Sequence, residues 1–405
     1  MHSLSSAVLK KALCCTGIAL ALMATVPASQ AAEAVSTPAP SSVSSAVTPR
    51  LLLPPIIYAA PGREANLYFD NVVLAPPGRR YLFDATCAKG RQQEERWTWT
   101  PGENENGDYA LTLEVRDTDD KIVAQGKTIV RVAKALAGQG KPLSVLVIGD
   151  SLTGASIYTD ELLKLFATPG NATLKLVGTH KPAGTVEGNV HEGYGGWTFG
   201  RFMTQYVATP QERPNMGSSP FVFLQDGKPV FDFPRYVRER LGGTAPDVVT
   251  VMLGTNDVFG ARDENLEEIT TAILDNAEKL LAGIRAGAPN ATIGLLMTVP
   301  PSASQDAFGA NYGANQTRWQ YRKNQHRLVE RLTERFSGRE GEKLFIVPTH
   351  INLDCVNNYP QLEAPVNARA TQKVVRANNG VHPSAEGYRQ IADSLYSWLK
   401  VNSTE

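Results

Sequence analysis

From residue 143 onward, short apolar segments alternate with longer segments of helical spacing, and this alternation restricts the fold. The apolar runs, such as 143–148 (LSVLVI) and 248–253 (VVTVML), are rich in β-branched residues, which is typical of strands buried on both faces. A strand–helix repeat builds a parallel sheet covered by helices on both faces, so an α/β domain is expected over residues 143–405. The other expected strands are 174–177, 292–298 and 344–347, and the expected helices are 156–167, 198–207, 233–241, 264–286, 318–336 and 384–401.

Residues 51–133 show a different pattern, in which short β-prone runs stand between turn signals. Pro-Gly pairs and an Asn-Gly pair interrupt the segment, and Tyr109, Leu111, Leu113 and Val115 alternate with polar neighbours as in a half-buried strand. The segment therefore predicts a small all-β sandwich domain, joined by a linker at 134–142 to the α/β domain. Its expected strands are 65–73, 80–84, 96–100, 109–116 and 121–132.

The first 31 residues read as an export signal. Lys10 and Lys11 precede an apolar run at 12–26, and small residues up to Ala31 offer a cleavage site. Residues 32–50 are rich in Ala, Ser, Pro and Thr and predict a flexible leader. No later apolar run approaches the length of a membrane span. We therefore expect a secreted or periplasmic protein with no integral membrane segment after signal removal.

Charge and cysteine content bear on the kind of partner that the protein binds and on whether it forms a disulfide. The chain has 40 Lys and Arg against 40 Asp and Glu, a balance that argues against a nucleic-acid partner. Signal removal leaves Cys87 and Cys355, which are expected in different domains. An oxidising compartment permits a disulfide between them, and two unpaired buried thiols are the alternative.

Four motifs follow expected strands or open the last helix. In a parallel sheet the residues beyond the carboxyl ends of the strands gather at one edge, where chemistry takes place. A serine at a strand-to-helix turn presents its hydroxyl at that edge, and a histidine before a closing helix can remain a neutral base. The motifs are Gly149-Asp150-Ser151-Leu152, the Gly-dense stretch 191–198, Gly254-Thr255-Asn256-Asp257 and His382-Pro383.

In their order and spacing these motifs resemble the blocks of the SGNH, or GDSL-type, hydrolases. The resemblance covers roughly residues 143–403 and leaves out the β region. It implies a flavodoxin-like three-layer α/β/α fold, hydrolysis of esters, and no metal or organic cofactor. The Gly-Tyr-Gly-Gly-Trp stretch at 193–197 resembles the loop of secreted carbohydrate esterases more than that of lipases.

The resemblance also implies roles for individual residues. Ser151 corresponds to the nucleophile and His382 to its general base. The backbone N–H groups of Ser151 and Gly196, together with the Asn256 side chain, correspond to the oxyanion hole. Such donors stabilise the negative charge that forms on the former carbonyl oxygen.

One position departs from the family pattern, because Asn379 stands where the family usually has an aspartate three residues before the histidine. An amide brings no charge to stabilise imidazolium. Three explanations are open: a Ser151–His382 dyad oriented by an amide or a backbone carbonyl, a substitute carboxylate such as Asp354, or deamidation of the Asn379-Gly380 pair.

The substrate is expected to be an acylated carbohydrate or another ester. Trp197, Tyr194, Phe308 and Tyr312 are candidates for the walls of a cleft, since aromatic faces beside polar groups suit sugar rings. Deacetylation of an extracellular glycan is the first hypothesis. The alternatives are a lipase, phospholipase or thioesterase with the same serine and histidine, and a catalytically impaired binding protein, which Asn379 motivates. No motif for a metal is present in the sequence.

Overall fold

The computed structural model describes residues 49–76, 78, 80–209 and 216–402. The expected signal peptide, residues 1–31, and nearly all of the expected leader, residues 32–50, lie outside these ranges. The described residues belong to one compact unit. In the described ranges, no helix combines the length and apolar character needed to cross a membrane.

A parallel sheet organises the second half of the chain. Its main strands have the order β11-β10-β15-β16-β17, and the short β12 pairs with β10 beyond the end of β11. This is the order of a flavodoxin-like, doubly wound sheet. The strands are β10 (Pro142–Gly149), β11 (Thr173–Val177), β12 (Glu192–Gly193), β15 (Val248–Met252), β16 (Thr292–Leu296) and β17 (Leu344–Val347).

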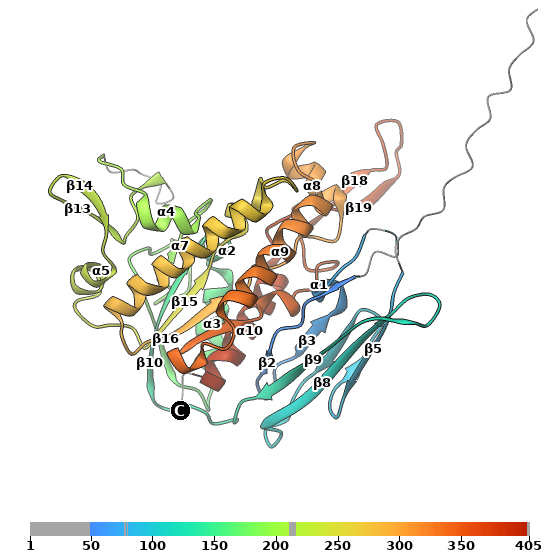
Figure 1. Cartoon of the computed structure of the whole chain (residues 1–405), viewed down its shortest axis with the longest axis horizontal. Coiled ribbons are helices and arrows are strands. Elements are labelled where there is room, and N and C mark those ends of the chain that lie inside the picture. The colour runs from blue at the N-terminus through green and yellow to red at the C-terminus, as the bar shows by residue number, and fades with distance from the viewer. Residues whose placement is uncertain (1–48, 77, 79, 210–215, 403–405) are drawn as a thin grey trace, which may run out of the picture. The chain divides into compact units, whose positions relative to one another are not determined.

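Helices cover both faces of this sheet. Successive side chains of β10 point in opposite directions, so that Leu146 and Ile148 join a core with α7 and α9, whereas Val145 and Val147 join a core with α3 and α10. Figure 1 shows α7 and α9 lying over one face. The predicted three-layer α/β/α fold is therefore confirmed. The helices are α3 (Ile157–Phe166), α4 (Phe199–Thr204), α5 (Phe233–Arg240), α7 (Leu266–Gly287), α9 (Arg318–Phe336) and α10 (Ala385–Asn402).

Strands dominate the first part of the described chain, as predicted. One sheet has the order β2-β9-β8-β5 and the other β3-β7-β6. Leu67, Trp97, Leu113 and Val130, which come from both sheets, share one hydrophobic core, and this arrangement is a β-sandwich. The strands are β1 (Arg50–Leu51), β2 (Ile56–Ala59), β3 (Ala65–Tyr68), β4 (Val73–Leu74), β5 (Leu82–Cys87), β6 (Arg91–Gln92), β7 (Arg96–Trp99), β8 (Gly107–Arg116) and β9 (Ile122–Val132).

The structure differs from the sequence prediction in its short elements. The expected strand 65–73 is interrupted by a one-turn helix, α1 (Phe69–Val72), whose apolar side chains Phe69 and Val72 both enter the core. Two hairpins lie in loops for which no element was expected. The strands β1, β2, β6 and β12 were not predicted either. The further unpredicted elements are α2 (Ser151–Gly154), α6 (Thr255–Phe259), α8 (Gln305–Tyr312), η2 (Glu340–Glu342), η3 (Thr349–Ile351), β13 (Val222–Gln225), β14 (Lys228–Phe231), β18 (Gln361–Pro365) and β19 (Lys373–Ala377).

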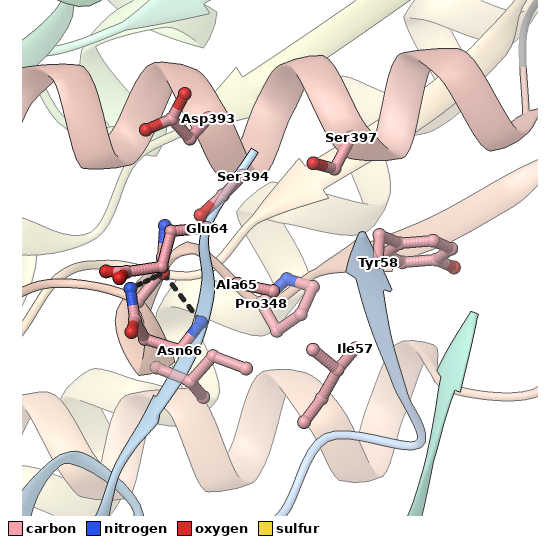
Figure 2. A pocket seen from close by; sticks show the side chains of 11 residues that line it. Ile57, Tyr58, Glu64, Ala65, Asn66, Pro348, Asp393, Ser394 and Ser397 are labelled. Atoms are coloured by element: carbon pink, nitrogen blue, oxygen red, sulfur yellow. Dashed lines mark hydrogen bonds between the residues drawn. The ribbon is translucent and has the colours of Figure 1, made fainter. Parts of the chain in front are cut away.

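Strands β2 and β3 pack directly against α10 and the η3 segment. The backbone and side-chain N–H groups of Asn66 both donate to Asn352 Oδ1, at 3.0 and 2.9 Å. Figure 2 shows Asn66 below Ser394 of α10 around a cavity of about 10 Å³, which has room for about one water molecule. The sandwich is therefore closely packed around Asn66 and Ser394. Division into separate domains at 134–142 stays a prediction.

Cys87 and Cys355 are both free thiols, so the disulfide alternative is not realised in this structure. Cys355 Sγ donates to Asn71 Oδ1 at 3.3 Å, within the same contact between the sandwich and the α/β part.

The buried His350 predicts acid sensitivity. Both of its ring nitrogens lack hydrogen-bond partners, and burial, followed by the Arg322 charge, lowers its pKa to about 3. The unfolded chain binds a proton here below a pKa of about 6.5, whereas the folded chain does not until about pH 3, so stability falls as the pH falls through that window. At pH 5 this one group costs about 2 kcal/mol of unfolding free energy relative to pH 7.5.

The variant His350→Gln isolates this contribution. Urea unfolding of both proteins at pH 7.5 and pH 5.0 gives four free energies of unfolding. We expect the natural protein to lose about 2 kcal/mol more than the variant on acidification. An equal loss in the two proteins would show that His350 does not carry the effect.

Candidate active site

The four sequence motifs meet at the carboxyl edge of the parallel sheet. Ser151 follows β10, Gly195 and Gly196 follow β12, and Asn256 follows β15. Strands β10 and β15 are neighbours in the sheet while their helices lie on opposite faces, and such a switch point forms a crevice at the strand ends. His382 reaches the same place from the turn that precedes α10.

Ser151 and His382 are in hydrogen-bond contact although 231 positions separate them. The distance from Ser151 Oγ to His382 Nε2 is 2.8 Å. Burial lowers the pKa of His382, so its imidazole is neutral at physiological pH and Nε2 can accept the hydroxyl proton. The pair therefore has the geometry of a nucleophile and its general base.

Local sequence fixes the serine at its turn. Asp150 caps α2 by accepting a hydrogen bond from the Leu152 N–H at 2.9 Å. A Cβ at Gly149 would lie 1.9 Å from Thr153 Oγ1, so only glycine allows the strand to enter this turn. Ser151 follows directly and is only partly buried, which leaves its hydroxyl open to the crevice.

The candidate oxyanion donors lie around this serine. A Cβ at Gly195 would be 4.0 Å from Ser151 Cβ, and Gly196 has a φ of +78°, a conformation that favours glycine. Asn256 Nδ2 donates to the Trp197 carbonyl at 3.0 Å and faces Asp150 Oδ2 at 3.4 Å. The Asn256 amide is thus held to the Gly-rich loop, beside the turn that carries Ser151.

Two buried residues at the start of the Gly-dense stretch 191–198 hold the Gly-rich loop in place. His191 Nδ1 accepts from the Gly193 N–H at 3.0 Å, so its proton is on Nε2, which lies 2.9 Å from Ser156 Oγ. Glu192 is buried and accepts hydrogen bonds from the hydroxyls of Tyr194 and Tyr236. Their position before the glycines was visible in the sequence, but their burial and partners were not.

Two buried carboxyl groups, Asp150 and Asp257, stand next to Ser151 and Asn256 in the turns that carry them. Burial raises the pKa of Asp150 to about 7. Burial, and then the neighbouring Asp150, raise the pKa of Asp257 to about 7 as well. Neither carboxylate forms a hydrogen bond with His382 among the described contacts, so their position supports the turns rather than the imidazole.

Asn379 holds the backbone of the histidine turn. Its Oδ1 accepts from the backbone N–H groups of Val381 and His382, at 3.1 and 2.9 Å. Among the described residues, no hydrogen bond joins Asn379 to the His382 ring. Asp354 is likewise engaged in its own loop, where it accepts from the backbone N–H groups of Val356 and Asn357.

Removal of the Asn379 acceptor is expected to slow catalysis by displacing the His382 backbone. For Asn379→Ala we expect kcat/KM for 4-nitrophenyl acetate to fall about 10- to 100-fold, because small misplacements of a catalytic group are costly. Asn379→Asp keeps an oxygen for both N–H groups and should stay within a few-fold of the natural protein or exceed it. Natural kcat/KM in the alanine variant would rule out this positioning role.

The structure corrects the expectation for most of the aromatic cleft candidates. Trp197 and Phe308 have 0% exposed surface, so they offer no face to a ligand. Phe308 instead supports the histidine turn, since a Cβ at Gly380 would lie 2.8 Å from its ring. Tyr194 is buried, with its hydroxyl on Glu192, and only Tyr312 is partly exposed.

Within the described ranges, no group of three or more His, Cys, Asp or Glu side chains is placed to hold a metal ion. The chemistry that the arrangement supports is nucleophilic attack by an activated hydroxyl beside hydrogen-bond donors.

Solved structures with a similar arrangement include carbohydrate esterases. A family 3 carbohydrate esterase of Clostridium thermocellum is 19% identical, with a TM-score of 0.37, covering 64% of this chain and 96% of that chain. A family 3 carbohydrate esterase from Talaromyces cellulolyticus is 18% identical, with a TM-score of 0.36 and coverage of 64% and 96%. A family 2 carbohydrate esterase with a carbohydrate binding domain from Corynascus thermopiles is 16% identical, with a TM-score of 0.33 and coverage of 84% and 91%. At these values the likeness says nothing about the substrate.

Among curated proteins, no sequence matches this chain significantly. The sequence does match the GDSL-like lipase/acylhydrolase family over residues 145–395, which is more than half of the chain and contains all four sequence motifs described above. The resemblance drawn from the sequence is thereby confirmed. The chain belongs to the GDSL-like lipase/acylhydrolase family of ester hydrolases.

Proposed function

We propose that this ester hydrolase is an exported serine esterase that removes short acyl groups, acetyl above all, from hydroxyls of a carbohydrate. The observation that carries the proposal is the 2.8 Å contact between Ser151 Oγ and His382 Nε2 at the open edge of the sheet. Export rests on the character of residues 1–31.

In the proposed first step, Ser151 Oγ attacks the ester carbonyl carbon while His382 Nε2 takes the hydroxyl proton. The carbonyl π electrons move to oxygen, which becomes an oxyanion. Collapse of this intermediate breaks the bond to the sugar oxygen, which leaves with the proton from His382. The products are the free sugar hydroxyl and an acyl group on Ser151.

In the second step a water molecule attacks the acyl carbon and gives its proton to His382 Nε2. The second oxyanion collapses, Ser151 Oγ leaves and recovers the proton, and the carboxylic acid is released. Both intermediates carry their charge on the same oxygen, so the same donors serve both halves of the reaction.

The proposed donors to that oxygen are the N–H groups of Ser151 and Gly196 and the Asn256 amide. One Nδ2 hydrogen of Asn256 is used by the Trp197 carbonyl at 3.0 Å. The other faces Asp150 at the long distance of 3.4 Å, and a short turn of the amide delivers it to a developing charge. The hydrogen bond to the Trp197 carbonyl therefore keeps the Asn256 amide beside the proposed position of the oxyanion.

The proposed site works as a dyad. Burial lowers the pKa of His382, and no carboxylate among the described residues raises it again. A low pKa keeps the base unprotonated in mildly acidic surroundings, at some cost in basicity. We therefore expect the acidic limb of the kcat/KM profile to lie below the ordinary histidine value of about 6.5.

Packing beside the catalytic turns favours a short acyl group. Trp197 and Phe308 pack in the core and expose no surface that could line a channel for a long chain. Rates across 4-nitrophenyl acetate, butyrate, octanoate and palmitate test this directly. We expect a steep fall beyond acetate, whereas a maximum at octanoate or longer would identify a lipase or thioesterase.

The absence of an acid at position 379 favours a second candidate, a binding protein with an impaired site. Turnover of acetyl esters separates the two. Release of acetate from an acetylated glycan by the natural protein, but not by Ser151→Ala, supports the esterase. No turnover above background by either protein supports the binding protein.

A further inference from the structure

A polar groove lies between the β-sandwich and the N-terminal end of α9, away from the catalytic pair. Two adjoining cavities of about 250 and 660 Å³ form it, which is in the size range of small-molecule sites. The walls common to both cavities carry two acids, two bases and two rings: Asp70, Glu94, Arg318, Arg322, Tyr81 and Phe83.

The charged groups of this groove are not paired with one another. Within the described ranges, neither Arg318 nor Arg322 makes an ion pair, and Arg318 Nε is buried without a hydrogen-bond partner. The other arginines of the same helix are all paired. Arg327 meets Glu267 at 2.6 Å, Arg331 meets Glu334 at 3.5 Å, and Arg335 meets Glu278 at 2.9 Å. The unpaired arginines of α9 are therefore the two that face the groove.

Arg322 is fixed in place and still has donors to offer. It is only 7% exposed, and its guanidinium donates to the backbone carbonyls of Asp70 and Asn71 and to Gln325 Oε1. These bonds use three of its five N–H groups. Arg318 lies four positions earlier on the same helix face, so the two guanidinium groups border one space.

We propose that this groove binds a neutral oligosaccharide. Its charged lining consists of arginines, which only donate, and carboxylates, which only accept, beside the amide of Asn71 and the hydroxyls of Tyr68 and Tyr81. A hydroxyl does both at once, so a sugar can bridge Arg318 or Arg322 to Asp70 or Glu94. Over both cavities the lining carries three carboxylates, Asp70, Glu94 and Glu95, and three arginines, Arg80, Arg318 and Arg322. The charges therefore balance and favour neither an anion nor a cation over a neutral ligand.

The rings of the groove supply the apolar part of such a site. Tyr81, Phe83 and Trp319 are partly exposed, and Phe83 is held by stacking on the buried Phe69 at 4.7 Å between ring centroids. The apolar face of a pyranose can lie on a ring of this kind while its hydroxyls reach the charged groups.

The groove also borders a segment that supports the catalytic turn. Pro300 and Pro301 line its floor, and the next residue, Ser302, donates its N–H to the Gly380 carbonyl two positions before His382. Sugar binding here would hold a carbohydrate chain against the enzyme while its ester reaches Ser151. This use of the groove rests on the proposed function, whereas the binding itself does not.

Isothermal titration of the full chain with neutral, ester-free hexasaccharides tests the proposal. The panel contains xylo-, cello-, manno- and chitohexaose, with hexagalacturonate as the anionic comparison. We expect binding of at least one neutral sugar, weakened about tenfold or more by Trp319→Ala and by Arg318→Gln. Arg331→Gln, on the same helix but outside the groove, should bind as the natural protein does.

A third variant separates sugar from anion recognition. Asp70→Asn should weaken the neutral sugar, whereas it would strengthen binding if the groove held an anion. No binding across the neutral panel at millimolar concentration, preference for hexagalacturonate, or equal affinity in the Arg318 and Arg331 variants would each overturn the proposal. If Trp319→Ala unfolds, Arg318→Gln decides the outcome.

Failure of this proposal can be told from failure of the esterase proposal. The groove variants should hydrolyse 4-nitrophenyl acetate at the natural rate, and Ser151→Ala should bind the hexasaccharide unchanged. Binding without ester turnover would overturn only the enzymatic proposal, and turnover without binding only the groove.

Discussion

Replacement of Ser151 by alanine is expected to lower kcat for 4-nitrophenyl acetate by at least about 10⁴-fold. The variant keeps the turn, since Gly149 and the Asp150 cap form it without the serine hydroxyl. It lacks the oxygen that lies 2.8 Å from His382 Nε2, so no acyl-enzyme can form. The remaining rate should come from the donors alone, which act on direct attack by water.

The control for this variant is Ser394→Ala on α10, a serine whose hydroxyl, among the described contacts, donates to the Gln390 carbonyl within its own helix. Its kcat should match that of the natural protein. The double variant of Ser151 and His382 should be no slower than Ser151→Ala, because the two act as one unit. A Ser151→Ala rate within tenfold of the natural rate would mean that another group performs the chemistry.

Loss of the Asn256 donor should be the next largest effect. For Asn256→Ala we expect kcat to fall about 10²- to 10³-fold, with a small change in KM, because the lost hydrogen bond forms chiefly with the charged intermediate. The variant also releases the Trp197 carbonyl, to which Nδ2 donates at 3.0 Å. Initial rates across substrate concentration separate kcat from KM.

Asn256→Asp distinguishes a donor from a packing residue. Aspartate keeps the size of asparagine but has no N–H to offer, so its kcat should fall at least as far as that of the alanine variant. A kcat near that of the natural protein for Asn256→Asp, with the fall confined to Asn256→Ala, would assign Asn256 to packing alone.

The fold of the α/β part could be predicted because its signals are local. Buried strands such as β10 and β15 are short apolar runs, and α9 was placed at its observed bounds because its apolar residues repeat at helical spacing. The one-turn helix α1 could not be predicted, because four residues are too few to show a helical repeat of apolar side chains. Its shape depends instead on two side chains that enter a core built by distant strands.

The candidate site was only partly visible in the sequence. Ser151, Asn256 and His382 stand in motifs at strand or helix ends, where the topology brings them together. The support given by His191 and Glu192 depends on burial and on Tyr236, 44 positions from Glu192, which no local pattern encodes. The same limit explains why Trp197 and Phe308 were wrongly expected to line a cleft. An aromatic ring near a loop has the same local sequence whether it lines a cleft or fills the core.

Mass spectrometry after treatment with a fluorophosphonate probe tests whether Ser151 is a nucleophile activated by His382. Such a probe reacts with an activated serine, so a peptide map locates the reactive hydroxyl and its dependence on the base. We expect one adduct on Ser151 of the natural protein and none on Ser151 of His382→Ala. An adduct on a different serine, no adduct at all, or equal labelling of Ser151 without His382 would contradict it.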